Sequence, residues 1–172
     1  WIQGDVNEGF AKADVVVGNV YRTPPWEHIA MEPEAGLAYL QEDGQLVIHT
    51  PLDSPFVARN WTAELLGVEN DRVRIVCPTM GGNFGARGDF VHVGVLAMLT
   101  LKTRKPVKLV YTREESMLGS SKSQSFYLKY KTGATKDGKL TSLEAEIIAD
   151  GGCFVNRPAL GIKGSPTNLK RK

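Results

Sequence analysis

Residues 79–89 form the stretch Thr79-Met80-Gly81-Gly82-Asn83-Phe84-Gly85-Ala86-Arg87-Gly88-Asp89. A β-branched run, Val73 to Val76, precedes it and an apolar segment, Val91 to Leu101, follows it, which predicts a strand, a loop and a helix in that order. Because glycine lacks a Cβ, a loop this rich in glycine lets another group approach its backbone closely. Exposed backbone N–H groups, together with the start of the helix, favour an anionic ligand such as a phosphate, an oxo group or a dithiolate. The alternative interpretation is a tight structural turn.

The glycine loop does not match the two common phosphate-binding patterns. A P-loop needs Lys-Ser or Lys-Thr after its last glycine, whereas Gly85 is followed by Ala86-Arg87. A dinucleotide-binding fingerprint needs Gly-x-Gly-x-x-Gly, and the spacing here is Gly81-Gly82-x-x-Gly85. The sequence therefore argues against a nucleotide phosphate loop of either kind.

Length and composition are those of an ordinary globular domain. The chain has 172 residues, of which 42% are hydrophobic and 23% are charged, which suits one domain with a sizeable core. A net charge of +2 is too small to indicate a nucleic-acid partner, and no apolar run is long enough to cross a membrane. We expect a cytoplasmic protein with neither kind of partner. The opening residues, Trp1 to Gly4, suggest a piece of a longer protein.

The cysteines and a small acidic cluster are the candidates for metal binding. Neither Cys77 nor Cys153 has a neighbour at metal-ligand spacing, so we expect two buried thiols. Glu27, His28 and Glu32 lie close together in the sequence, but two carboxylates and one histidine make a poor zinc site. A solvated or hydrogen-bonded His28 is the better interpretation.

Local patterns predict short strands mixed with helices. The expected elements are a helical turn within 5–13, a strand over 15–21 with a bulge or bend at 18–19, a hairpin of 37–40 with 46–49, a helix over 55–66, a strand over 71–76, a helix over 91–101, a strand over 107–111, a helical turn over 114–118, and a second hairpin of 126–131 with 143–149.

The helix over 55–66 carries the clearest boundary signals. Ser54 can cap its start, Pro55 suits its first position, and Gly67 suits its end. Apolar residues at i, i+4 spacing predict its buried face, formed by Val57, Trp61 and Leu65.

Several motifs together resemble one enzyme family. Met80 to Arg87 resembles the glycine-phenylalanine loop of the xanthine dehydrogenase/aldehyde oxidase family of molybdenum hydroxylases. Five further segments resemble that family in the same order: Gly4-Asp5-Val6-x-Glu8-Gly9-Phe10, Glu27-His28 with Met31-Glu32-Pro33, Asp53-Ser54-Pro55, Thr112-Arg113-Glu114-Glu115, and the hairpin of 133–150. The order of several motifs is far more specific than any one of them.

The resemblance implies an α+β fold with mixed sheets and a few packed helices. Residues 1–155 would be a fragment of the molybdopterin-binding domain, and 156–172 an irregular tail. The parent enzyme would hydroxylate an aldehyde or an N-heterocycle, take oxygen from water, and pass electrons to iron–sulfur clusters and FAD on partner subunits or domains. The cofactor would be molybdopterin in a dinucleotide form, with the metal held by pterin sulfurs and no direct protein ligand.

The resemblance also implies a set of cofactor contacts, with Phe84 flanking the substrate. The expected cofactor-binding residues are Gly81, Gly82, Asn83, Phe84, Gly85, Ala86, Arg87 and Asp53. The family's catalytic glutamate, a general base, lies far downstream of these motifs. We therefore assign no catalytic residue to this chain and expect it to be inactive alone.

Two positions depart from the family pattern. Asp53 stands where the family commonly has a glutamine that donates to an oxo group, and an ionised carboxylate cannot donate. We expect the Asp53 carboxylate at the start of the helix over 55–66, where the helix N-terminus favours an anion; the alternative turns it into the cofactor cavity as a neutral acid. Gly88 stands where purine-oxidising members have a glutamate, which argues against a purine substrate.

A different class of function stays open. A non-catalytic assembly or interaction domain could retain the same scaffold, and such a domain would hold no molybdenum. The basic residues within 168–172 could contact nucleic acid, but this segment is short and lacks interleaved aromatic residues, so a solvated chain end is the better interpretation.

Overall fold

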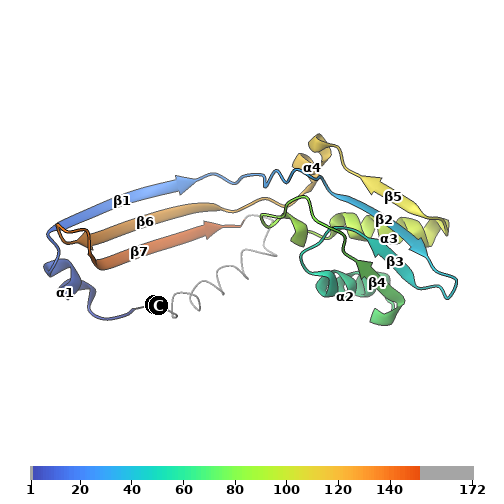
Figure 1. Ribbon diagram of the computed structural model, residues 1–172, viewed down its shortest axis with the longest axis horizontal. Helices are drawn as coiled ribbons and strands as arrows, with labels where there is room; N and C mark the ends of the chain where they lie inside the picture. The colour runs from blue at the N-terminus through green and yellow to red at the C-terminus, as the bar shows by residue number, and fades with distance from the viewer. Residues whose placement is uncertain (1, 152–172) are drawn as a thin grey trace. The chain divides into compact units, whose positions relative to one another are not determined.

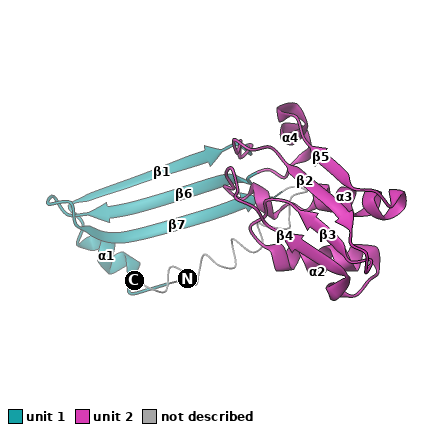
Figure 2. Cartoon of the chain, turned by 45° about the vertical axis from the view of Figure 1, so that its right-hand side comes forward, with its two compact units in different colours: residues 1–26, 123–172 teal, residues 27–122 magenta. Residues whose placement is uncertain are grey.

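The computed structural model describes residues 2–151. The chain divides into two compact units, one formed by residues 1–26 with 123–172 and the other by residues 27–122 (Figure 2). Cys153, the expected boundary at residue 155 and the expected tail all lie outside the described residues. Among residues 2–151, no helix has the length and apolar character needed to cross a membrane.

The first unit is a three-stranded antiparallel sheet with one short helix (Figure 1). Helix α1 (Val6–Ala11) begins at Asp5, whose carboxylate accepts hydrogen bonds from two backbone N–H groups of the first turn. The strands are β1 (Val15–Thr23), β6 (Ser125–Ala134) and β7 (Leu140–Asp150), in the order β1-β6-β7. The expected helical turn and the second hairpin are confirmed.

The bulge expected in the first strand is wrong. Strand β1 pairs with β6 without a register shift from Val15↔Ala134 to Thr23↔Phe126. Gly18 and Asn19 lower strand propensity locally, but their regular pairing with β6 keeps both residues in the strand. The irregularity lies instead between Gly133 and Ala134, in the pairing of β6 with β7.

The second unit is a mixed four-stranded sheet with packed helices, as expected. Its strands are β2 (Ala35–Leu40), β3 (Leu46–His49), β4 (Val73–Val76) and β5 (Val107–Val110), in the order β4-β3-β2-β5. The β3–β4 pair is parallel and the other two pairs are antiparallel. A parallel pair needs a long crossover, which α2 (Pro55–Leu66) and a short 3₁₀ turn (Asn70–Arg72) provide.

Helices α2 and α3 (Val91–Thr103) contact each other and the sheet (Figure 1), and α4 (Arg113–Gly119) follows β5. The core lies between sheet and helices and consists of Ala38, Leu46, Ile48, Leu52, Ala58, Val93, Leu96 and Ala97. Helix α3 therefore confirms the expectation of a helix after the glycine loop.

The expected buried face of α2 is wrong, although its boundaries are confirmed. The buried residues of α2 are Ala58, Thr62 and Ala63, of which the first two lie one position along from the predicted Val57 and Trp61. Trp61 stays 37% exposed and packs its ring at the edge of the core, 6.1 Å from the Phe90 ring. The α3 residue Gly94 instead lies against the Trp61 and Leu65 side chains of α2. The Ser54 side chain makes no capping hydrogen bond.

Candidate functional site

The glycine loop lies between β4 and α3 and is held in shape by Asn83. The Asn83 Oδ1 accepts hydrogen bonds from the Gly85 N–H at 3.1 Å and the Arg87 N–H at 3.0 Å. The Asn83 carbonyl accepts from the Ala86 N–H at 2.9 Å. Gly82, Phe84 and Gly85 have φ of 112°, 53° and 102°. Turns that include residues with positive φ can present successive N–H groups in a concave site for an anion.

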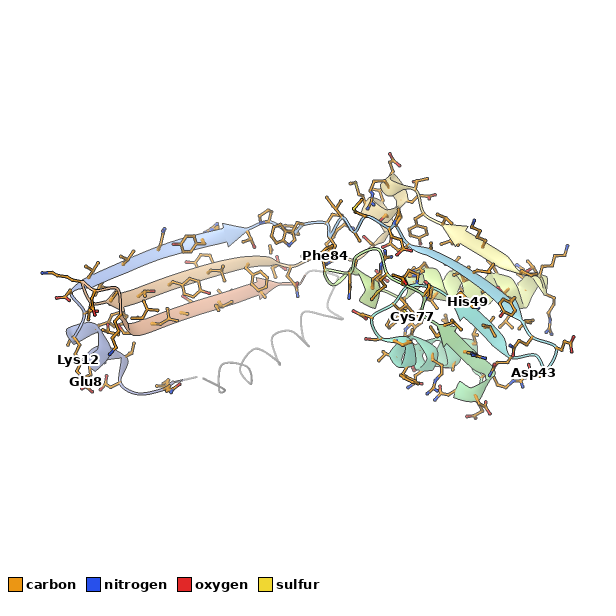
Figure 3. All side chains as sticks on the ribbon, viewed as in Figure 1. Glu8, Lys12, Asp43, His49, Cys77 and Phe84 are labelled. Carbon is orange, nitrogen blue, oxygen red and sulfur yellow. The ribbon has the colours of Figure 1, made fainter. Side chains whose placement is uncertain are left out.

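Three successive backbone amides of this loop have no acceptor among residues 2–151. Within the described part of the protein, the N–H groups of Gly82, Asn83 and Phe84 donate to no protein atom. Phe84 is 74% exposed, and Figure 3 marks its place on the chain. A buried site that closes over the loop would therefore need a ligand to satisfy these donors.

The start of α3 does not directly adjoin the loop, as the sequence predicted it would. A 3₁₀ turn (Ala86–Gly88) separates the loop from α3. The Asp89 carboxylate accepts from the Val91 N–H at 3.1 Å and from the Ser121 N–H at 2.9 Å. The negative charge that the helix N-terminus favours is therefore supplied by Asp89, and the loop amides themselves are the available anion donors.

Asp53 is hydrogen-bonded to the glycine loop. Its Oδ2 accepts from the Asn83 Nδ2 at 3.2 Å, and its backbone N–H donates to the Arg87 carbonyl at 3.4 Å. The sequence predicts this carboxylate at the helix start and gives no sign of the loop contact. As an acceptor from Asn83, the carboxylate orients the side chain that shapes the loop.

Arg87 is buried behind the loop, with its side chain 1% exposed. Its guanidinium donates to the carbonyls of Gly82 at 3.1 Å, Pro33 at 3.4 Å and Glu32. Its Nη atoms lie 3.5 Å from Glu32 Oε2 and 3.9 Å from Glu34 Oε1. Direct cofactor contact by Arg87 stays a prediction, and the structure shows a side chain directed into the protein.

The segment before β2 forms the wall behind the loop. Glu32 Oε2 accepts from the Gly81 N–H at 2.7 Å, and the Glu32 N–H donates to the Gly81 carbonyl at 3.1 Å. Arg113 fixes this segment by donating to the carbonyls of Ala30 at 2.6 Å and Met31 at 3.0 Å. The sequence suggested Glu32 only as a weak metal ligand. The motif that it forms with Met31 was the one signal that could have pointed to its place beside the loop.

The other residues of the acidic cluster have separate partners. Glu27 pairs with Lys122 at 2.8 Å and accepts from the Ser120 hydroxyl at 3.1 Å. His28 has its pKa lowered by burial, and its imidazole lies beside Gly85. No group of three potential metal ligands occurs among residues 2–151.

The expectation of a buried thiol at Cys77 is wrong, because this residue is exposed (Figure 3). Its Sγ nonetheless contacts the backbone of Leu52, accepting from the N–H at 3.2 Å and donating to the carbonyl at 3.0 Å. Cys77 follows directly after β4. It therefore lies beyond the end of the strand and outside the core, where cysteine is usually found.

A buried histidine adjoins this wall. His92 is 3% exposed and its Nε2 lies 3.1 Å from the Thr50 hydroxyl, which donates to the Ala35 carbonyl at 2.8 Å. Since that hydroxyl proton is already used, Nε2 must donate to Thr50. Burial lowers the His92 pKa, and the nearby Glu34 carboxylate opposes that effect in part.

This lowered pKa predicts a loss of stability in mild acid. Below the ordinary histidine pKa of 6.5 the unfolded chain binds a proton that folded His92 resists. The free energy of unfolding should therefore fall with pH below about 6.5, by at most about 1.4 kcal/mol per pH unit for one group. His92→Gln should reduce this slope in urea titrations between pH 7 and pH 5. Equal slopes for wild type and His92→Gln would contradict the prediction.

Comparison with known proteins places this geometry in a family. The model of the molybdopterin cofactor-binding domain matches residues 1–166. The chain belongs to the molybdopterin cofactor-binding domain family. It is 39% identical over 153 residues to the nicotinate dehydrogenase large molybdopterin subunit of Eubacterium barkeri, and 32% identical over 152 residues to the xanthine dehydrogenase of Emericella nidulans.

These matches cover 89% and 87% of the chain but only 36% and 11% of the two relatives. The aldehyde oxidoreductase structure from Desulfovibrio gigas superposes with a TM-score of 0.74 at 28% identity, over 86% of this chain and 16% of that one. The resemblance inferred from the motifs and the α+β fold are thus confirmed. The relatives are oxidoreductases, so the molybdopterin cofactor-binding domain here comes from an enzymatic family.

The glycine loop suits the group that this family binds. Molybdopterin carries anionic sulfur, oxo and phosphate groups, and successive free amides are suitable donors for such groups. Gly82, the first of the three residues, has no Cβ that would crowd the loop. A Cβ at this position would lie 3.2 Å from Ala30 Cβ and from Phe84 Cε2. The fit thus rests on backbone atoms of the loop, with no side-chain metal ligand.

Proposed function

We propose that this chain holds the molybdenum cofactor of a hydroxylase through the backbone of its glycine loop. The observation that carries the proposal is the row of three amides, of Gly82, Asn83 and Phe84, without acceptors in the described chain. Amides of an exposed turn can be left to solvent, so the distinguishing feature of this loop is the arrangement of its three free amides. Here the three amides are consecutive, and the carbonyls on the opposite side of their peptide bonds already accept hydrogen bonds.

Each residue of the site has a limited role in this proposal. The three amides bind anionic groups of the cofactor, and the exposed Phe84 ring forms an apolar wall beside the substrate. Asn83 holds the loop closed, and Asp53 orients Asn83 by accepting from its Nδ2. When bound, the cofactor supplies the two-electron oxidation of a substrate carbon, with oxygen taken from water. The general base belongs to another part of the parent protein.

The substrate class that we favour is an N-heterocycle, with an aldehyde as the alternative. The relative at 39% identity is a nicotinate dehydrogenase, whose named substrate is an N-heterocycle. Gly88 replaces the glutamate of purine-oxidising members, which argues against a purine. We further propose the dinucleotide form of the cofactor, iron–sulfur and flavin partners, and a cytoplasmic parent enzyme.

Metal and pterin analysis of the full-length parent tests the proposal. We expect stoichiometric molybdenum and pterin in the parent, together with hydroxylation of an N-heterocycle or an aldehyde. The 172-residue chain alone should show neither stoichiometric molybdenum nor turnover, because it spans only 36% and 11% of two relatives and would leave the cofactor exposed. A parent purified with its partners but without molybdenum would favour the non-catalytic assembly domain instead.

A further inference from the structure

We propose that Arg87 and Glu32 are positioning residues that aim the amides of the glycine loop at the cofactor, without contacting the cofactor themselves. This inference rests on the proposed function of the loop. It concerns residues on the far side of the loop from its free donors.

The peptide geometry of the loop links each carbonyl to the N–H group that follows it. The peptide bonds of residues 2–151 include no cis bond. In a planar trans peptide, the carbonyl of one residue and the N–H of the next point in opposite directions. Whatever holds a carbonyl on one side of the loop therefore fixes the following N–H on the other side.

Three successive carbonyls of the loop are held in this way. The Gly81 carbonyl accepts from the Glu32 N–H at 3.1 Å, and the Gly82 carbonyl accepts from Arg87 Nε at 3.1 Å. The Asn83 carbonyl accepts from the Ala86 N–H at 2.9 Å. The N–H groups opposite these carbonyls are those of Gly82, Asn83 and Phe84, which are the three amides without acceptors in the described chain.

Arg87 is suited to this role because its guanidinium has several fixed donors. Its planar fork contacts the carbonyls of Glu32 and Pro33 as well as that of Gly82, so it connects the loop to the wall behind it. The carboxylates of Glu32 and Glu34, at 3.5 and 3.9 Å, balance its buried charge. A lysine would retain the charge but lose this fork.

Glu32 completes the connection at the start of the loop. Its carboxylate accepts from the Gly81 N–H at 2.7 Å while its own N–H holds the Gly81 carbonyl. Gly81 is thus fixed through both polar atoms of its backbone. A 1% exposed Arg87 has no surface on which to meet a ligand, so its effect on the cofactor passes through the loop.

The experiment compares Arg87→Lys and Arg87→Gln with matched substitutions at Arg59 in the full-length parent. Arg59 contacts Asn60 and the Phe56 ring on its own helix, so it serves as the control. Three quantities are measured: the rate of cofactor loss, the melting temperature, and hydrogen exchange of a peptide spanning residues 80–86 in the loaded protein. The last quantity reports on loop amides independently of activity.

We expect cofactor loss to accelerate about ten- to a hundredfold in Arg87→Gln and less in Arg87→Lys, as for residues that orient ligand groups from behind. Amide protection in residues 80–86 should fall while protection in α3 stays unchanged. The Arg59 variants should match wild type. If Arg87→Gln fails to fold, Arg87→Lys decides, since it keeps a positive charge between the two carboxylates.

Two results would overturn the inference. One is wild-type cofactor retention in Arg87→Lys and Arg87→Gln. The other is a loss of protection that extends equally to α3 with a matching fall in melting temperature, which would make Arg87 merely structural. A wild-type parent without any molybdenum or pterin is a different outcome, because it would overturn the proposed function and this inference together.

Discussion

Gly82→Val in the full-length parent is expected to reduce cofactor retention roughly tenfold or more, equivalent to about 1.4 kcal/mol or more of binding free energy. Gly82 has φ of 112°, a conformation that a β-branched residue adopts only with strain of about 1–3 kcal/mol. Its new Cβ would also lie 3.2 Å from Ala30 Cβ and from Phe84 Cε2. The loop would have to shift, and with it the three amides that meet the cofactor.

Gly67→Val is the matched control for this prediction. Gly67 ends α2 with φ of 66° and has no atom within 4 Å of the position of an added Cβ. It therefore shares the backbone strain of Gly82→Val without crowding the loop. Molybdenum content per folded protein should fall only for Gly82→Val. Normal molybdenum content and activity in Gly82→Val would show that the loop is only a turn.

The fold was largely predictable because its signals are local. The Asp43-Gly44 turn between apolar runs, the boundaries at Pro55 and Gly67, and Pro106 after α3 each depend on a few neighbouring residues. The errors arose where tertiary contacts decide. Pairing with β6 kept Gly18 regular, and packing in the folded chain buried Ala58, Thr62 and Ala63 of α2 rather than its large apolar stripe.

The site was predictable as a loop but not as a bonded assembly. The glycine pattern and the family resemblance pointed to this loop as the cofactor-binding backbone, and that assignment stays a prediction. They did not reveal that Glu32 reaches Gly81 or that Arg87 turns inward, because these contacts join segments about fifty residues apart. Arg87 can be buried because carboxylates such as that of Glu34 are buried beside it. A single sequence does not show which carboxylates are buried.

The contact between Asp53 and Asn83 predicts a rescue by exchange of the two side chains. Asn83→Asp alone should destabilise the protein by about 1–3 kcal/mol, since it removes the Nδ2 donor and places two carboxylates together. Asp53→Asn alone should cost less, because the new amide at position 53 still offers an acceptor oxygen to Asn83.

The double variant Asp53→Asn/Asn83→Asp should recover most of the loss. The amide at position 53 can donate to the carboxylate at position 83, which still accepts from the N–H groups of Gly85 and Arg87. A coupling energy of about 0.5–3 kcal/mol is therefore expected in a double-mutant cycle of urea unfolding near neutral pH. Acidification should reduce the defect of Asn83→Asp alone, because protonation of either carboxylate relieves the repulsion. Strictly additive single effects would mean that Asp53 faces the helix start and does not orient the loop.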